Sequence, residues 1–115
     1  MDVANVFVSL GVMDHAAGCA RWSTVLGREP DRRPMLSCCE WVLTDSVLFQ
    51  VLDNPKDGAV DTISLRVGDL EAEIARLHAA GIAVGDPQAV PGFDTLRITT
   101  LADPDGNTLN LLGGE

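Results

Sequence analysis

The chain is 115 residues long with a mass of 12.2 kDa, which fits one domain, so we expect no separate cofactor domain. Hydrophobic residues make up 46% of it and charged residues 22%, so wholesale disorder is excluded. Its 17 acidic and 8 basic residues leave a net charge of −9, which argues against nucleic acid as a partner, because a phosphate backbone is bound through cationic contacts. The apolar runs are short, and the N-terminus lacks a basic region followed by a long apolar stretch. We therefore expect no membrane span, no signal peptide and a cytoplasmic location.

The first half of the chain alternates between strand and helix patterns. Apolar and mixed residues alternate over residues 3–12, which predicts a strand with one strongly apolar face. Asp14 then suits the N-cap of a helix, and Gly27 suits its C-terminal end. Short strands follow at residues 41–44 and 47–52 around a turn at Asp45 and Ser46, with a weaker strand near residues 29–35.

The second half repeats this order. Residues 62–67 alternate as a strand, Asp69 suits a second N-cap, and Gly81 suits the end of that helix. The tract from Asp103 to Asn107, Asp-Pro-Asp-Gly-Asn, is a strong turn signal. Strands are predicted on both sides of it at residues 96–101 and 108–112, with a weaker strand within residues 82–90.

The two halves therefore indicate a duplicated β-α-β-β-β module. We predict a single α+β domain over residues 1–115, with a first module at about residues 3–53 and a second at about residues 61–113. The polar, turn-rich residues 54–60 would link them. In each module the apolar face of the sheet would pack under the helix, which leaves the mixed face free to line a cleft.

The three cysteines do not form an obvious disulfide framework. Cys38 and Cys39 are adjacent, and neighbouring side chains on a strand point to opposite faces, so they should not bridge each other. Together with Cys19, they are expected to be reduced thiols that are buried as small apolar residues.

A tandem β-α-β-β-β chain that ends in the DPDGN turn resembles the vicinal oxygen chelate superfamily of glyoxalases, bleomycin-resistance proteins and extradiol dioxygenases. The matching segments are residues 8–14, 64–81 and 103–111, so the resemblance covers essentially the whole chain. It implies cupped mixed sheets with helices on the convex side. It also implies a homodimer, because small members of the superfamily usually pair.

The enzymes of this superfamily hold a divalent metal through His, Glu or Gln on inward strand positions. Carried over one by one, those positions fall on Phe7, Gln50, Thr62 and Asn110. Only Gln50 resembles a ligand used in the family. The resemblance therefore implies the fold without the metal chemistry, and we expect no metal, no cofactor and no catalytic residue. This departure from the superfamily's metal ligands favours a protein that is not an enzyme, but the question stays open.

The predicted inward face mixes apolar surface with neutral hydrogen-bonding groups, which is typical of a small-molecule pocket. Trp41 could stack on a flat ligand or lie in the core, and the strand arginines could pair with a ligand carboxylate or form surface salt bridges. The predicted ligand-binding residues are Phe7, Ser9, Trp41, Leu48, Gln50, Thr62, Ser64, Arg66, Arg97 and Asn110.

The first functional hypothesis is a metal-independent protein that binds a small aromatic or amphipathic molecule, with antibiotic sequestration as its best-defined form. The acidity of the chain suits a cationic ligand. The second hypothesis is a metal-dependent lyase, isomerase or dioxygenase of the glyoxalase type. The third is a non-catalytic accessory protein that binds a biosynthetic intermediate or a partner protein.

Overall fold

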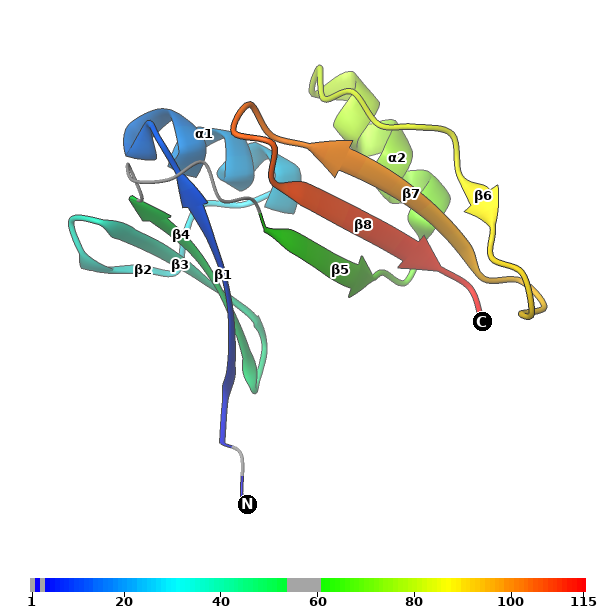
Figure 1. The fold of residues 1–115 in the computed structure, drawn as a ribbon, viewed down its shortest axis with the longest axis horizontal. Coiled ribbons are helices and arrows are strands. Elements are labelled where there is room, and N and C mark those ends of the chain that lie inside the picture. Colours follow the sequence, from blue (N-terminus) through cyan, green and yellow to red (C-terminus); the bar gives the residue numbers. More distant parts are fainter. Residues whose placement is uncertain (1, 3, 54–60) are drawn as a thin grey trace. The chain divides into compact units, whose positions relative to one another are not determined.

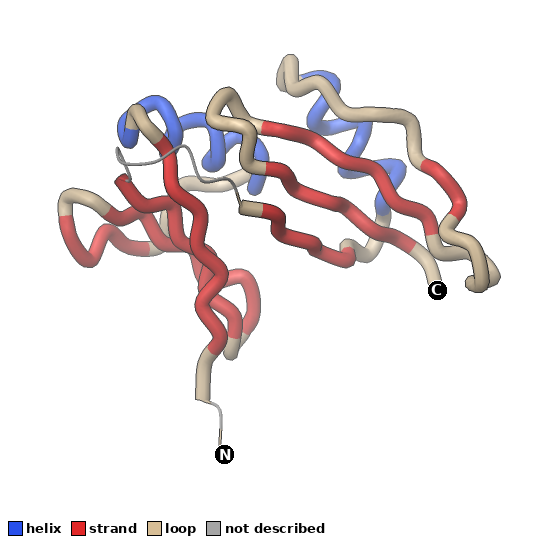
Figure 2. The backbone as a smooth tube through the Cα atoms, viewed as in Figure 1, coloured by secondary structure: helices blue, strands red, loops and turns tan. Residues whose placement is uncertain are grey.

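A computed structural model describes residues 2, 4–53 and 61–115. The chain divides into two compact units, one ending at Asp61 and the other beginning at Thr62. Each unit carries one four-stranded sheet and one helix (Figures 1 and 2). The predicted α+β fold with duplicated β-α-β-β-β modules is thereby confirmed, and the predicted linker at residues 54–60 lies outside the described residues.

The first module has the strand order β1-β4-β3-β2. β1 is parallel to β4, whereas β3 is antiparallel to both β4 and β2. The strand pattern of residues 3–12 is shorter in the structure than predicted, and β3 begins three residues earlier than predicted. The elements are β1 (Val6–Val12), α1 (His15–Leu26), β2 (Arg32–Met35), β3 (Cys38–Thr44) and β4 (Val47–Asp53).

The second module has the equivalent order β5-β8-β7-β6, with β5 parallel to β8 and the other pairs antiparallel. Its weakest predicted strand, within residues 82–90, is reduced to two residues. The elements are β5 (Thr62–Arg66), α2 (Leu70–Ala79), β6 (Gln88–Ala89), β7 (Arg97–Ala102) and β8 (Thr108–Gly113). In the part of the chain that the structure describes, no helix has the length and hydropathy needed to cross a bilayer.

Both helices begin where the sequence predicts. The Asp14 side chain accepts a hydrogen bond from the Ala17 amide, and the Asp69 side chain accepts one from the Ala72 amide. Gly27 ends α1 in the left-handed conformation, with φ of 80°. α2 ends on Ala80, and Gly81 follows it with φ of 79°.

Each helix approaches its own sheet closely at a glycine. A Cβ atom built on Gly18 of α1 would lie 2.6 Å from a methyl carbon of Val12 on β1. A Cβ atom on Gly113 of β8 would lie 2.5 Å from the Cβ of Leu70, the first residue of α2. A larger residue at either glycine would push the helix away from the sheet.

The cores of the two modules differ in chemistry. In the first, Trp22 of α1 and Trp41 of β3 both pack on Phe49 of β4, with ring centroids 5.4 and 5.9 Å away, and all three rings are fully buried. The buried apolar side chains of the second module are aliphatic, namely Ile63, Leu70, Ile74, Leu77, Ile82, Leu101, Leu109 and Leu111.

One sequence-based expectation is wrong: the structure joins Cys19 and Cys39 in a disulfide, with Cα atoms 6.4 Å apart. Cys39 points to the face of the sheet that α1 covers, and Cys19 lies on the buried side of α1. Cys38 stays a free, buried cysteine and, as expected, is not bridged to its neighbour.

Candidate functional site

The face of the first sheet opposite α1 carries a continuous row of hydrogen-bonded polar side chains. Strand register places Ser9 of β1 beside Gln50 of β4, and Gln50 beside Glu40 of β3. The Ser9 hydroxyl donates to Gln50 Oε1 at 2.8 Å, and Gln50 Nε2 donates to Glu40 Oε1 at 2.9 Å. Arg32 of β2 completes the row by donating to Glu40 Oε2. The row therefore crosses all four strands of the sheet.

Glu40 is the charged centre of this row and is only 3% exposed. Burial alone would raise the pKa of its carboxyl. The hydrogen bonds from Gln50 and Arg32, together with the positive charge of Arg32, outweigh that effect and hold the pKa below its ordinary value. Burial and the negative charge of Glu40 both raise the pKa of the neighbouring Cys38 thiol. Glu40 is thus an ionised, paired carboxylate and a weak general base.

An apolar row lies next to the polar one on the same face. Phe7, Leu48 and Val42 are paired across β1, β4 and β3, two residues from Ser9, Gln50 and Glu40 along each strand. Phe7 is 53% exposed and Val42 is 38% exposed, whereas Leu48 is buried between them. The face therefore combines an open apolar surface with hydrogen-bonding groups, as ligand pockets do.

The second module places a neutral row at the equivalent strand positions. Ser64 of β5 pairs with Asn110 of β8, which pairs with Thr100 of β7. Asn110 Nδ2 donates to the Ser64 hydroxyl at 3.2 Å, and the Thr100 hydroxyl donates to Asn110 Oδ1 at 2.7 Å. Thr62 and Thr108 share a hydrogen bond of 2.8 Å on the same face.

Eight of the ten predicted ligand-binding residues thus fall on the sheet face away from the helix of their own module, in two separate groups. Phe7, Ser9, Leu48 and Gln50 form the group of the first module. The group of the second module is Thr62, Ser64, Arg66 and Asn110, where Arg66 donates to the carbonyl of Gly114 at 3.3 Å.

Trp41 and Arg97 do not belong to these groups. Trp41 is fully buried on the helix side, where its indole Nε1 donates to the carbonyl of Arg28 at 3.0 Å. Arg97 lies on the helix side of the second sheet and forms an ion pair with Glu71 of α2. Neither side chain lies on the sheet face that carries the polar row of its module.

Sequence reasoning missed Arg32, Glu40 and Thr100 as members of the rows. Nothing local to Glu40 indicates its place in the row, because a glutamate on a strand is more often exposed. The equivalence of the two modules could have placed Glu40 in the row. Gln50 and Asn110 occupy matching positions, so their partners on the neighbouring strands, Glu40 and Thr100, must extend the two rows.

The four positions at which the superfamily's enzymes hold a metal do not offer a suitable donor set. Phe7 has no donor atom, and the hydroxyl of Thr62 is a poor neutral ligand. The carbonyl oxygens of Gln50 and Asn110 already accept hydrogen bonds from Ser9 and Thr100, respectively. A divalent metal needs convergent imidazoles or carboxylates, and these residues do not fit it.

A further groove lies along α1 and the segment that leads into β3. It has a volume of about 1060 Å³ and is open to solvent. His15 and Cys19 line it from α1, and the exposed Met35 and Leu36 line it from the other side. It was not among the sequence-based predictions.

Comparison with known proteins assigns the fold. The glyoxalase-like domain family matches residues 6–112. A glyoxalase / bleomycin resistance protein from Catenulispora acidiphila is 24% identical, with a TM-score of 0.86 over 96% of this chain and 98% of that chain. No curated protein matches the sequence.

Two further solved structures carry the same fold with different activities in their names. TnmS3, an antibiotic binding protein from Streptomyces sp. CB03234, is 24% identical, with a TM-score of 0.80 over 100% of this chain and 99% of that chain. Lactoylglutathione lyase from Agrobacterium tumefaciens is 15% identical, with a TM-score of 0.80 over 99% of this chain and 96% of that chain. At these identities the likeness shows the fold alone.

Proposed function

Because the chain belongs to the glyoxalase-like domain family of the vicinal oxygen chelate superfamily, we propose that it is a metal-independent small-molecule-binding protein of that superfamily. The observation that carries the proposal is the chemistry of the two polar rows. They retain hydrogen-bonding groups on the sheet faces that the superfamily uses, while the metal positions hold Phe7, Gln50, Thr62 and Asn110. Such faces can bind and orient a ligand but lack the donors for a Lewis-acidic metal.

The first module supports a flat, partly apolar ligand. Phe7 and Val42 offer exposed apolar surface on which an aromatic ring can lie. Ser9 and Gln50 run beside that surface and can exchange their mutual hydrogen bond for bonds to polar ligand atoms. Glu40 adds a carboxylate to the row, and its charge is paired with that of Arg32. The net charge of −9 favours a cationic ligand over an anionic one.

Antibiotic sequestration is the form of this function that we propose first. Because an antibiotic-binding protein has this fold, antibiotics are the first ligands to test. The mechanism would be stoichiometric burial of the drug, with no bond formed or broken. We also propose that the protein is a cytoplasmic homodimer. The exposed Val6 on β1, on the face opposite Phe7, supports the homodimer, because pairing of two copies would bury apolar surface that a domain of this size leaves open.

Isothermal titration calorimetry with bleomycin tests the proposal, both with and without a strong metal chelator. We expect saturable binding that the chelator does not change. Phe7→Ala should weaken binding by about tenfold, because an aromatic contact contributes about 1.5 kcal/mol. Phe93→Ala is the matched control, because Phe93 is similarly exposed, at 59%, but lies between β6 and β7 and belongs to neither row.

The same titration separates the alternatives. Binding that depends on an added divalent metal, or turnover of the glutathione hemithioacetal of methylglyoxal, would replace the proposal with a glyoxalase-type enzyme. If a panel of cationic and neutral aromatic antibiotics gives no heat, sequestration is wrong, and an accessory role with a biosynthetic intermediate takes its place. Light scattering at the titration concentration measures the mass, and a monomer would contradict the homodimer.

A further inference from the structure

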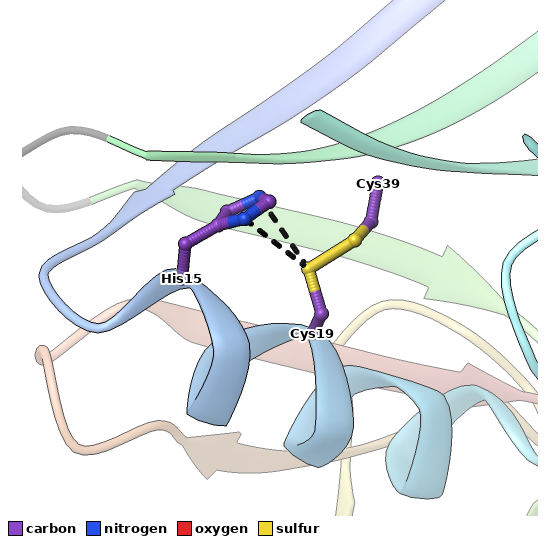
Figure 3. A group of neighbouring side chains, drawn as sticks. All are labelled: His15, Cys19 and Cys39. Carbon is purple, nitrogen blue, oxygen red and sulfur yellow. Dashed lines mark hydrogen bonds between the residues drawn. A yellow bond between two sulfur atoms is a disulfide. The ribbon is translucent and has the colours of Figure 1, made fainter. Parts of the chain in front are cut away.

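Three side chains that can bind a metal ion meet on the helix-covered side of the first module, away from the polar row. His15 and Cys19 are four residues apart on α1, so their side chains leave the same face of the helix. Cys39 reaches them from β3, and Figure 3 shows the His15 imidazole beside the bridge between the two sulfur atoms. One ligand atom from each of the three residues lies within 4.8 Å of the other two.

We propose that reduction of the Cys19–Cys39 disulfide converts this cluster into a zinc site formed by His15 Nδ1 and the two thiolates. A dithiol reductant supplies two electrons and two protons, so the sulfur–sulfur bond breaks, two thiols form, and the reductant becomes a disulfide. Zinc then displaces the two thiol protons to solvent. Two thiolates balance the charge of the ion, and the imidazole completes a set of nitrogen and sulfur donors that suits zinc.

The hydrogen bonding of His15 supports this site. Its Nε2 lies 3.0 Å from the carbonyl oxygen of Val51 on β4. A carbonyl can only accept a hydrogen bond, so Nε2 carries the proton, and Nδ1 of the neutral ring keeps its lone pair. Metal-binding histidines are usually held in this way, with the second ring nitrogen donating to a backbone carbonyl. The contact with Val51 therefore sets the tautomer. Nε2 lies 3.4 Å from Cys19 Sγ and is nearer to it than Nδ1 is, so the ring must turn for Nδ1 to face the ion.

The spacing of the atoms fits a tetrahedral ion after a small rearrangement. Nδ1 of His15 lies 3.9 Å from Cys19 Sγ. Standard zinc bonds in tetrahedral geometry place a nitrogen and a sulfur ligand about 3.6 Å apart and two sulfur ligands about 3.8 Å apart. The sulfurs must therefore separate after reduction, and rotation of the two cysteine side chains can provide this movement because their Cα atoms are 6.4 Å apart.

Two neighbouring features complete the coordination. His15 and Cys19 line the open groove of about 1060 Å³, which admits water to a fourth position on the ion. Arg33 donates from its guanidinium to Cys39 Sγ at 2.7 Å and would remain as an outer hydrogen bond to the bound thiolate. Zinc at this place would be separate from Gln50, the superfamily metal position on β4, because Gln50 shares a sheet face with Glu40 and Cys39 points to the opposite face.

Cobalt titration in the absence of oxygen tests the proposal, because Co²⁺ takes the place of zinc and is coloured. We expect the reduced protein to bind one Co²⁺ per chain, with thiolate charge-transfer and tetrahedral d–d absorption bands that zinc then bleaches. The oxidised protein should show neither band. Absence of these bands from the reduced protein, or equal bands from the oxidised protein, would overturn the proposal.

Matched variants locate the ligands. His15→Gln should weaken binding by more than about 100-fold, since even the loss of an outer-shell partner costs about 10- to 100-fold. His78→Gln should leave it unchanged, because His78 lies on α2 of the other module. Cys39→Ser removes one of the two proposed sulfur ligands and should abolish the thiolate charge-transfer bands of bound Co²⁺. Cys38→Ser should preserve these bands. Equal effects of His15→Gln and His78→Gln would contradict the site.

A second measurement on the unmutated chain guards against variants that fail to fold. Zinc should protect Cys19 and Cys39 of the reduced protein from alkylation, as mapped by mass spectrometry of peptides. Equal alkylation of both cysteines with and without zinc would exclude them as ligands.

Discussion

The two modules have the same strand order and the same place for a polar row, yet they differ in what surrounds it. The first joins its row to an ion pair, packs three aromatic rings against one another on its other face and links the helix to the sheet with a disulfide. The second has a neutral row and an aliphatic core. The same strand order thus accommodates two different sets of side chains. The ion pair of the row, the aromatic core and the disulfide all belong to the first module.

This asymmetry offers a way to ask whether the modules are stable independently. Both tryptophans of the chain lie in the first module, so tryptophan fluorescence reports on that module, whereas far-ultraviolet circular dichroism reports on both. Unfolding curves that coincide for the two signals would indicate one cooperative unit. Curves that separate would show that each module follows its own equilibrium.

The largest expected effect comes from Phe49→Ala. Phe49 is fully buried between the two tryptophans, so truncation should cost about 3–5 kcal/mol of unfolding free energy. The counterpart Leu109→Ala, in the core of the second module, should cost about 2–5 kcal/mol. Urea unfolding followed by both signals measures these losses. If Phe49→Ala leaves the fluorescence transition in place, the aromatic core does not stabilise the first module.

Reduction of the disulfide should destabilise the first module by about 3 kcal/mol, because Cys19 and Cys39 are 20 residues apart and the bond restricts the unfolded chain. The measurement is the fluorescence transition in a chelating buffer, with and without a phosphine reductant. Cys38→Ser should respond to the reductant as the unmutated chain does, since Cys38 is not bridged. A transition that the reductant does not move would show that the bond adds no stability.

The turns provide the next comparison. In the second module, Asp103 accepts hydrogen bonds from the amides of Asp105 and Asn107 and from the buried Asn107 side chain. Asp103→Ala should therefore cost about 2 kcal/mol, because it leaves buried donors unpaired. Asp45→Ala, in the exposed hairpin turn of the first module, should change the unfolding free energy by less than about 0.5 kcal/mol. Equal losses would contradict this reading of the DPDGN turn.

Periodicity and capping residues were sufficient to predict the modules, the helix starts at Asp14 and Asp69, and the face of Gln50 and Asn110. They could not place Trp41. A regular hairpin closed by Asp45 and Ser46 would pair Trp41 with Gln50 and turn it toward the polar row. The structure instead shifts the register between Val42 and Thr44, which pairs Trp41 with Phe49 and moves it to the other face.

The disulfide was missed for a related reason. Its formation depends on how α1 crosses the sheet, which brings Cys19 over Cys39, and no local pattern encodes that crossing. The same crossing brings His15 to Val51 and creates the three-residue cluster. Predictions from the sequence therefore succeeded for groups that share one strand or one helix face, and failed for groups that meet only when elements pack.

The smallest expected losses of unfolding free energy come from comparing the charged row of the first module with the neutral row of the second. Glu40→Gln should cost about 1–2 kcal/mol at neutral pH, a modest amount because Arg32 is 57% exposed and can be solvated. The pKa of Glu40 is lowered in the folded state, so its contribution is complete above the ordinary glutamate pKa of about 4.3 and is lost as the pH falls through the lower folded value. The difference in unfolding free energy between the unmutated chain and Glu40→Gln should therefore shrink in acid.

Thr100→Val removes an uncharged hydroxyl from the equivalent position of the second module, so its cost, about 0.5 kcal/mol, should not vary with pH. Urea unfolding of the three proteins from neutral pH down to the lowest pH at which all remain folded measures both differences. A pH-independent gap for Glu40→Gln would mean that the Arg32 pair does not hold the carboxylate in its charged form.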